Sequence, residues 1–143
     1  RAGWDPLWQG YLTFYKASVD EKTTQQTFER LTSGTEPMGA FLALDETGRA
    51  VGAVHWILHR SCWTVGDYCY LQDLFVADGT RGLGIGRRLI EHVYAAAQAA
   101  GCSRVHWLTH ETNADAMQLY DRIAEKSGFV LRNRHRPKAD KTF

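Results

Sequence analysis

The sequence has no long apolar run, because no stretch approaches the ~18 consecutive apolar residues of a membrane-spanning helix. An excess of one charge is also absent, since 17 Lys and Arg residues balance 16 Asp and Glu residues and leave a formal net charge of +1. Proteins that bind nucleic acid through bulk charge need a clear positive excess. We therefore expect no nucleic-acid partner and no membrane partner.

Cysteine is scarce. The three cysteines, Cys62, Cys69 and Cys102, are an odd number and form no Cys-x-x-Cys pair. They indicate neither a disulfide framework nor a thiolate zinc site, and a reduced, cytoplasmic protein is the default expectation. We also expect no metal: His55 and His59 share one face of a predicted strand but have no third ligand nearby in the sequence, so we interpret them as exposed strand residues.

What the sequence does contain is typical of one folded domain. A length of 143 residues is enough for a single core, and we assign residues 1–143 to one domain. Six Phe, six Tyr and five Trp residues exclude a disordered chain.

Hydrophobic periodicity predicts an α/β (α+β) fold. Asp5-Pro6, a capping carboxylate followed by proline, predicts the start of a helix over residues 5–18. We interpret the aromatic stripe at residues 4–15 as core, with the edge of this helix a candidate wall of a pocket. The further predicted elements are a helix at residues 23–31, antiparallel strands at residues 40–44, 50–59 and 68–76, a long helix from Ile85 that ends at Gly101, a strand at residues 103–109, a helix at residues 113–126 and a last strand at residues 129–131.

Glycines alternate with other residues at the start of the long helix, at Gly82, Gly84 and Gly86. Successive backbone N–H groups there can point at one anion, and the helix dipole adds about half a positive charge. Arg81, Arg87 and Arg88 add full positive charges, so the segment predicts a phosphate or pyrophosphate site. It is not a lysine-containing P-loop, and the dinucleotide fingerprint fails because Arg87 occupies the place of its third glycine.

The pattern Arg81-x-x-Gly84-x-Gly86 fits the pyrophosphate motif Gln/Arg-x-x-Gly-x-Gly/Ala of the GNAT N-acetyltransferases. The run Tyr70-Leu71-Gln72-Asp73-Leu74-Phe75-Val76 resembles the fourth strand of that family. The pattern Asn113-x-x-Ala116-x-x-Leu119-Tyr120, followed by Ser127-Gly128-Phe129, resembles its cofactor-contacting helix and next strand. The resemblance extends over nearly the whole chain, and the Trp-rich first helix is similar to a bacterial subgroup related to yeast histone and polyamine acetyltransferases.

The resemblance implies the GNAT fold: a mixed, mostly antiparallel sheet that is split by a bulge at the fourth strand, residues 68–76, and flanked by helices. The pantetheine arm of acetyl-CoA would lie in the split and pair with the backbone of that strand. Family members begin with a short strand before the first helix, so we expect this chain to lack that strand. The residues implied in acetyl-CoA binding are Leu74, Phe75, Val76, Arg81, Gly82, Leu83, Gly84, Ile85, Gly86, Arg87, Asn113 and Tyr120.

The implied reaction moves the acetyl group of acetyl-CoA to a primary amine by direct attack in a ternary complex. An amine with a pKa of ~10.4 is mostly protonated at pH 7, so a base must take its proton. Polyamine acetyltransferases carry glutamate where this chain has Gln72, so Asp73 is the first candidate for base or amine binding, and Glu111 with His110 the second; a positioned water is the third. Tyr120 matches the general acid that protonates the leaving thiolate.

Several alternatives stay open. The acceptor is a small-molecule amine, a polyamine or a protein lysine, with Gln72, Asp73 and Glu111 as candidate substrate residues. Asp73 is as well explained by a structural hydrogen bond, and Tyr120 by packing on its helix. The alternative function is a CoA-binding sensor or interaction module without turnover. Dimers are common in the resembling subgroup, so we also expect a homodimer.

Overall fold

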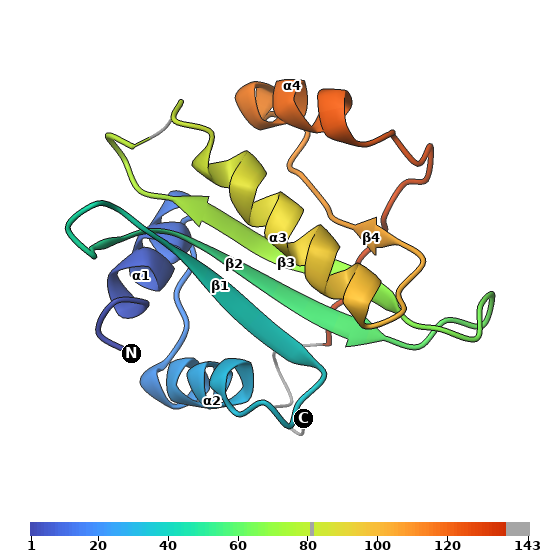
Figure 1. Ribbon diagram of the computed structural model, residues 1–143, viewed down its shortest axis with the longest axis horizontal. Helices are drawn as coiled ribbons and strands as arrows, with labels where there is room; N and C mark the ends of the chain where they lie inside the picture. The colour runs from blue at the N-terminus through green and yellow to red at the C-terminus, as the bar shows by residue number, and fades with distance from the viewer. Residues whose placement is uncertain (81, 137–143) are drawn as a thin grey trace. The chain divides into compact units, whose positions relative to one another are not determined.

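The computed structural model describes residues 1–80 and 82–136, and the chain divides into two compact units, Arg1–Leu108 and Thr109–Phe143. Arg81, the first residue of the predicted pyrophosphate motif, lies outside the described residues. The first unit contains α1 (Asp5–Phe14), α2 (Glu21–Thr32), β1 (Met38–Leu44), β2 (Ala50–His59), β3 (Tyr68–Val76), α3 (Ile85–Ala99) and β4 (Val105–His106), and the second contains α4 (Ala114–Ile123) (Figure 1).

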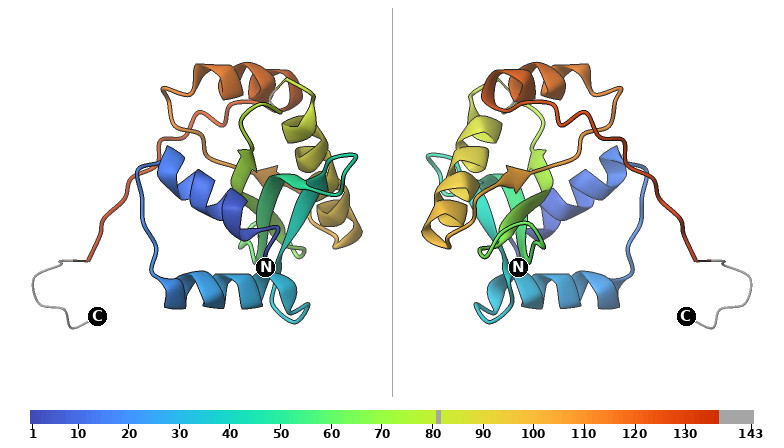
Figure 2. Two further views of the ribbon diagram at one scale, coloured as in Figure 1. Left: turned by 90° about the vertical axis from the view of Figure 1, so that its left-hand side faces the viewer. Right: turned by 90° about the vertical axis from the view of Figure 1, so that its right-hand side faces the viewer.

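The first unit is a layered structure around a four-stranded sheet. Its strand order is β1-β2-β3-β4, with antiparallel pairs between the first three strands and a parallel pair between β3 and β4. Helices α1 and α2 cover one face of the sheet and α3 covers the other (Figure 2). The predicted mixed, mostly antiparallel sheet flanked by helices is therefore confirmed.

A β-bulge interrupts β3. His55 of β2 pairs with Asp73, but the next residue, Trp56, pairs with Leu71, so Gln72 is an extra residue on β3. A bulge bends its strand and increases the local twist. The interruption lies in the strand where the family resemblance implies one.

Beyond the bulge, one edge of β3 is open. β4 has only two residues, and its pairing with β3 ends at Tyr70. Ala77 donates its N–H to the carbonyl of Val51 in β2, and successive strand residues direct their backbone groups to opposite edges. The backbone groups of Leu74 and Val76 therefore point away from β2, to an edge that none of the described strands covers.

The first helix is shorter than predicted and ends at Phe14. Lys16 adopts the left-handed conformation with φ 53°, and its N–H donates to the carbonyl of Thr13. The N–H of Ala17 donates to the carbonyl of Leu12, which completes a Schellman motif. Glycine is the usual residue at this position, so a lysine there gave no sequence signal.

The start of α1 also differs from the prediction. Trp4 occupies the N-cap position and no side chain caps the helix, although Pro6 stands in the first turn as expected. Asp5 instead accepts a hydrogen bond from Nε of Arg1 at 2.8 Å.

The C-terminal elements are shorter than predicted. β4 covers two of the residues expected at 103–109, and α4 ends before residue 126. Residues 129–131 form no strand, and the side chains of Phe129, Val130 and Leu131 are 90%, 73% and 59% exposed. An extended segment becomes a strand only when a neighbour pairs with its backbone, and none of the described residues does so.

None of the helices in the described ranges is long and apolar enough to cross a membrane.

Candidate functional site

Two glycines of the turn between β3 and α3 have left-handed backbone conformations. Gly82 and Gly84 adopt positive φ angles of 83° and 76°, a conformation that favours glycine. Gly84 is the N-cap of α3 and supplies no side-chain cap to the first helical N–H groups. Such N–H groups, together with the helix dipole, bind anions well. Leu83 between the glycines is 71% exposed, so the turn is open to a ligand.

Gly86 has a different role. It lies in the first turn of α3 and packs on β3, where an added Cβ would be 3.8 Å from Val76 and 3.9 Å from Leu74. These are ordinary van der Waals distances, so alanine fits at this position. The structure thus explains why the motif accepts either glycine or alanine there.

Replacement of Gly84 and of Gly86 by alanine is expected to change the thermal stability of the protein in opposite directions. Gly84→Ala places a Cβ in a left-handed conformation, at a cost of about 1–2 kcal/mol, which corresponds to a fall in Tm of roughly 3–6 °C. The matched control Gly86→Ala adds a good helix former in a space that admits it. Thermal unfolding with and without CoA measures both; equal Tm values for the two variants would contradict this account of the turn.

On the other face of the sheet, α1 approaches β3 closely. Gly10 lies in the middle of α1, and an added Cβ there would be 3.0 Å from Cζ of Phe75. Glycine weakens a helix interior, but here it allows the ring of Phe75 to pack against the helix. The close approach brings the aromatic side chains of α1 over Asp73, which is two residues from Phe75 on the same face of β3.

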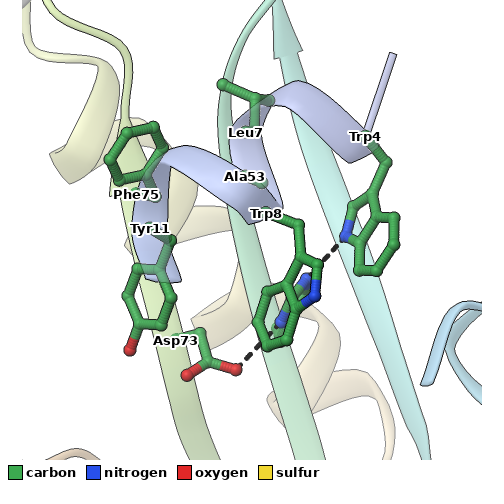
Figure 3. Close-up of a pocket in the computed structure, with 8 residues that line it drawn as sticks. Trp4, Leu7, Trp8, Tyr11, Ala53, Asp73 and Phe75 are labelled. Atoms are coloured by element: carbon green, nitrogen blue, oxygen red, sulfur yellow. Dashed lines mark hydrogen bonds and ion pairs between the residues drawn. The ribbon is translucent and has the colours of Figure 1, made fainter. Parts of the chain in front are cut away.

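Asp73 is the end of a buried chain of hydrogen bonds. Nε1 of Trp4 donates to Nε2 of His55 at 2.9 Å, and Nδ1 of His55 lies 2.9 Å from Oδ2 of Asp73 (Figure 3). His55 is 5% exposed, and the side chain of Asp73 is 18% exposed. The interpretation of His55 as an exposed strand residue is therefore wrong, because α1 covers its face of the sheet, whereas His59 is exposed as expected.

These residues line a small, partly open pocket. The rings of Trp4 and Trp8 are stacked, with centroids 5.5 Å apart. Burial, followed by the negative charge of Asp73, raises the pKa of Tyr11, so its hydroxyl stays protonated. The full lining is Trp4, Leu7, Trp8, Tyr11, Ala53, His55, Asp73 and Phe75 (Figure 3). Aromatic faces around one carboxylate are suited to an ammonium group.

The remaining predicted residues divide between the two units. Gln72 is the exposed bulge residue of β3. In the second unit, Glu111 is exposed in a turn, and Asn113 caps α4 by accepting a hydrogen bond from the N–H of Ala116 at 3.4 Å. Tyr120 lies on α4 and is half-buried.

Sequence reasoning found Asp73 but missed His55. The pairing register of strands 50–59 and 68–76 could have indicated its role, because that register sets His55 opposite Asp73. Trp4, Trp8 and Tyr11 at the edge of the first helix line this pocket, and its use as the amine pocket stays a prediction.

Comparison with known proteins agrees with this arrangement. The sequence model of the acetyltransferase (GNAT) family matches residues 4–124. The chain belongs to the GNAT family. It is 37% identical over 133 residues to the D-amino-acid N-acetyltransferase HPA3 of Saccharomyces cerevisiae, covering 92% of this chain and 83% of that protein. A shorter match, 38% over 60 residues, covers 42% of this chain and 35% of the thialysine N-epsilon-acetyltransferase of Mus musculus.

A solved structure supports the GNAT fold. The structure of AAC(6')-Iy in complex with a bisubstrate analog, CoA-S-monomethyl-acetylneamine, has a TM-score of 0.76 and 18% sequence identity, and the match covers 92% of this chain and 91% of that chain. The protein is thus a GNAT N-acetyltransferase, and the use of acetyl-CoA follows from the family. The described residues fit that co-substrate, because β3 offers an open edge and the glycine turn offers backbone donors.

Proposed function

We propose that this enzyme acetylates the primary amine of a small molecule of the amino-acid type, by direct attack of the amine in a ternary complex. The observation that carries the proposal is the aromatic pocket with Asp73 at its wall, beside the bulge of β3. Two of the similar proteins are named for amino-acid substrates, a D-amino acid and thialysine. Aromatic faces beside one carboxylate suit a single ammonium group.

Acetyl-CoA supplies the acetyl thioester. We propose that the outward-facing backbone groups of Leu74 and Val76 bind its pantetheine arm, with Phe75 between them. The turn and first helical residues of α3 bind its pyrophosphate through backbone N–H groups and arginine charges. The residues proposed to bind the pyrophosphate are Arg81, Gly82, Leu83, Gly84, Ile85, Gly86 and Arg87. Asn113 and Tyr120 of the second unit are proposed as further residues that bind acetyl-CoA.

The protein then has to move two protons. In the proposed mechanism Asp73 takes one from the substrate ammonium, which frees the nitrogen lone pair for attack. The faces of Trp8 and Tyr11 hold the ammonium group before this step. After attack the C–S bond breaks and Tyr120 gives a proton to the departing thiolate. The second proton, which the nitrogen loses as the amide forms, returns Tyr120 to its protonated state. Gln72 and Glu111 contact the rest of the substrate.

A panel of amines tests the proposal. The purified protein is mixed with acetyl-CoA and with D- and L-amino acids, thialysine, polyamines, an aminoglycoside and lysine peptides. Free thiol and product mass are then followed. We expect the highest kcat/KM for a free amino acid or its amine analogue. Acetylation of peptide lysines alone would contradict the proposed acceptor, and thermal stabilisation by CoA without thiol release from any amine would indicate a sensor instead.

We also propose that the enzyme is a cytoplasmic homodimer. The exposed apolar segment of Phe129, Val130 and Leu131 supports the dimer, since a second copy would cover it. Light scattering during gel filtration is expected to give twice the chain mass. Substitution of Val130 by Glu is expected to shift the protein to the monomer, and an unchanged mass would exclude this segment from the interface.

A further inference from the structure

The hydrogen-bond partners of His55 determine which of its ring nitrogens carries the proton. The indole N–H of Trp4 can only donate, and it points at Nε2 of His55 from 2.9 Å. Nε2 therefore accepts, so the neutral ring carries its proton on Nδ1 and donates it to Oδ2 of Asp73. A doubly protonated ring would direct an N–H at the N–H of Trp4, so Trp4 opposes that form.

We propose that Trp4 and His55 are positioning residues that hold the Asp73 carboxylate in place without neutralising it, so that the pocket selects its amine as the ammonium cation. The inference rests on the proposed function, in which Asp73 receives the proton of the amine. An imidazolium at His55 would form an ion pair with Asp73 and cancel its charge. A neutral imidazole orients the carboxylate and leaves the full negative charge to the substrate.

The same arrangement decides where the proton goes. When the ammonium is deprotonated, one N–H bond breaks, the electron pair stays on nitrogen, and an O–H bond forms on Asp73. His55 does not take this proton, because its Nε2 lone pair already accepts from Trp4. Asp73 keeps 18% of its side chain exposed, which provides the path by which the proton returns to water.

Two tyrosines interact electrostatically with the Asp73 carboxylate. Burial and then Asp73 raise the pKa of both Tyr11 and Tyr70, as expected for phenols beside a carboxylate. The titratable groups beside Asp73 are Tyr11 on α1, His55 on β2 and Tyr70 on β3. Tyr15, just after α1, contacts Tyr11, and His106 on β4 stacks on Tyr70. Asp5 on α1 is ion-paired with Arg1.

Nitrogen NMR of the protein without ligands tests the tautomer and does not depend on activity. Long-range 15N–1H correlations are expected to show one neutral form of His55 at neutral pH, with the proton on Nδ1. Trp4→Phe removes the N–H donor and is expected to release the ring to the Nε2-protonated or charged form. Trp8→Phe is the matched control: the indole of Trp8 donates to Thr24 at 3.3 Å, so His55 keeps its tautomer.

Two amide variants separate positioning from packing. The amide of His55→Asn takes nearly the place of Nδ1 and keeps a donor for Asp73, whereas that of His55→Gln takes nearly the place of Nε2 and keeps the partner of Trp4. We expect His55→Gln to lower kcat/KM for the amine roughly 10- to 100-fold, the effect of losing a hydrogen bond to a charged group. His55→Asn is expected to recover most of this loss, and both variants keep the Kd for CoA.

The outcomes separate the inference from the proposed function. A wild-type His55 that is Nε2-protonated or charged at neutral pH overturns the inference, whatever the enzyme acetylates. Equal kcat/KM losses in His55→Asn and His55→Gln also overturn it, since they indicate packing alone. A wild type that acetylates no amine while His55 shows the expected tautomer instead contradicts the proposed function. If His55→Gln does not fold, the spectra of the wild type and of Trp4→Phe still decide the question.

Discussion

Asp73→Asn is expected to lower kcat/KM for the amine by roughly 10²- to 10⁴-fold, the usual contribution of a general base. Asparagine has nearly the shape of aspartate, so the variant still accepts a hydrogen bond from Nδ1 of His55 through its amide oxygen. It cannot accept the proton of the ammonium, and it removes the negative charge that holds the cation. Initial rates of thiol release over a range of amine concentrations measure the effect.

Asp67→Asn is the matched control for this prediction. Asp67 is paired with Arg60 at 3.3 Å at the end of the β2–β3 hairpin and does not line the pocket. Its substitution also removes one negative charge from the protein. The kcat/KM for the amine is expected to stay within about twofold of the wild-type value, because an exposed ion pair contributes little. If Asp73→Asn and its control have similar activity, the base is elsewhere, with Glu111 or water as the next candidates.

Tyr120→Phe is expected to lower kcat by roughly 10²-fold or more, because the variant removes the proposed proton donor of the leaving thiolate. The phenyl ring keeps the packing of the tyrosine on α4, so the Kd for CoA is expected to change little. Stopped-flow or steady-state thiol release gives kcat, and calorimetry with CoA gives the Kd.

Tyr94→Phe serves as the control for that variant. Tyr94 is also a helical tyrosine, on α3, and 50% of it is exposed. Removal of its hydroxyl is expected to leave both kcat and the Kd unchanged. A Tyr120→Phe enzyme with the kcat of the wild type would remove Tyr120 from the mechanism and leave it as a packing residue.

The sequence predicted the bounds of helices and strands best where a hydrophobic pattern is followed by a clear turn or glycine signal. The strands at residues 50–59 and 68–76 have the predicted bounds, and the long helix begins at the predicted Ile85. Buried apolar residues recur at the expected spacing in β3 and α3, whereas β2 contains a continuous buried run over residues 51–55; glycine or a turn follows each element. The glycine pattern placed an anion-binding turn before this helix, and Gly84 there adopts a positive φ that only glycine adopts without strain.

The errors arise where structure depends on partners distant in the sequence. Lys16 ends α1 in a conformation that glycine usually supplies, so the sequence predicted four more residues of helix. Residues 129–131 have strand composition, but a strand exists only when another segment pairs with it. His55 has an ordinary strand position, and only the folded chain places Trp4 and Asp73 on either side of its ring.

A crystal structure of this enzyme with a covalent CoA–amine bisubstrate tests the central claim most directly. The account predicts the pantetheine arm along the open edge of β3, hydrogen-bonded to the backbone of Leu74 and Val76. It also predicts the amine nitrogen within hydrogen-bond distance of a carboxylate oxygen of Asp73, between the rings of Trp8 and Tyr11. An amine nitrogen bound away from the α1 pocket, with Asp73 contacting only His55, would contradict it.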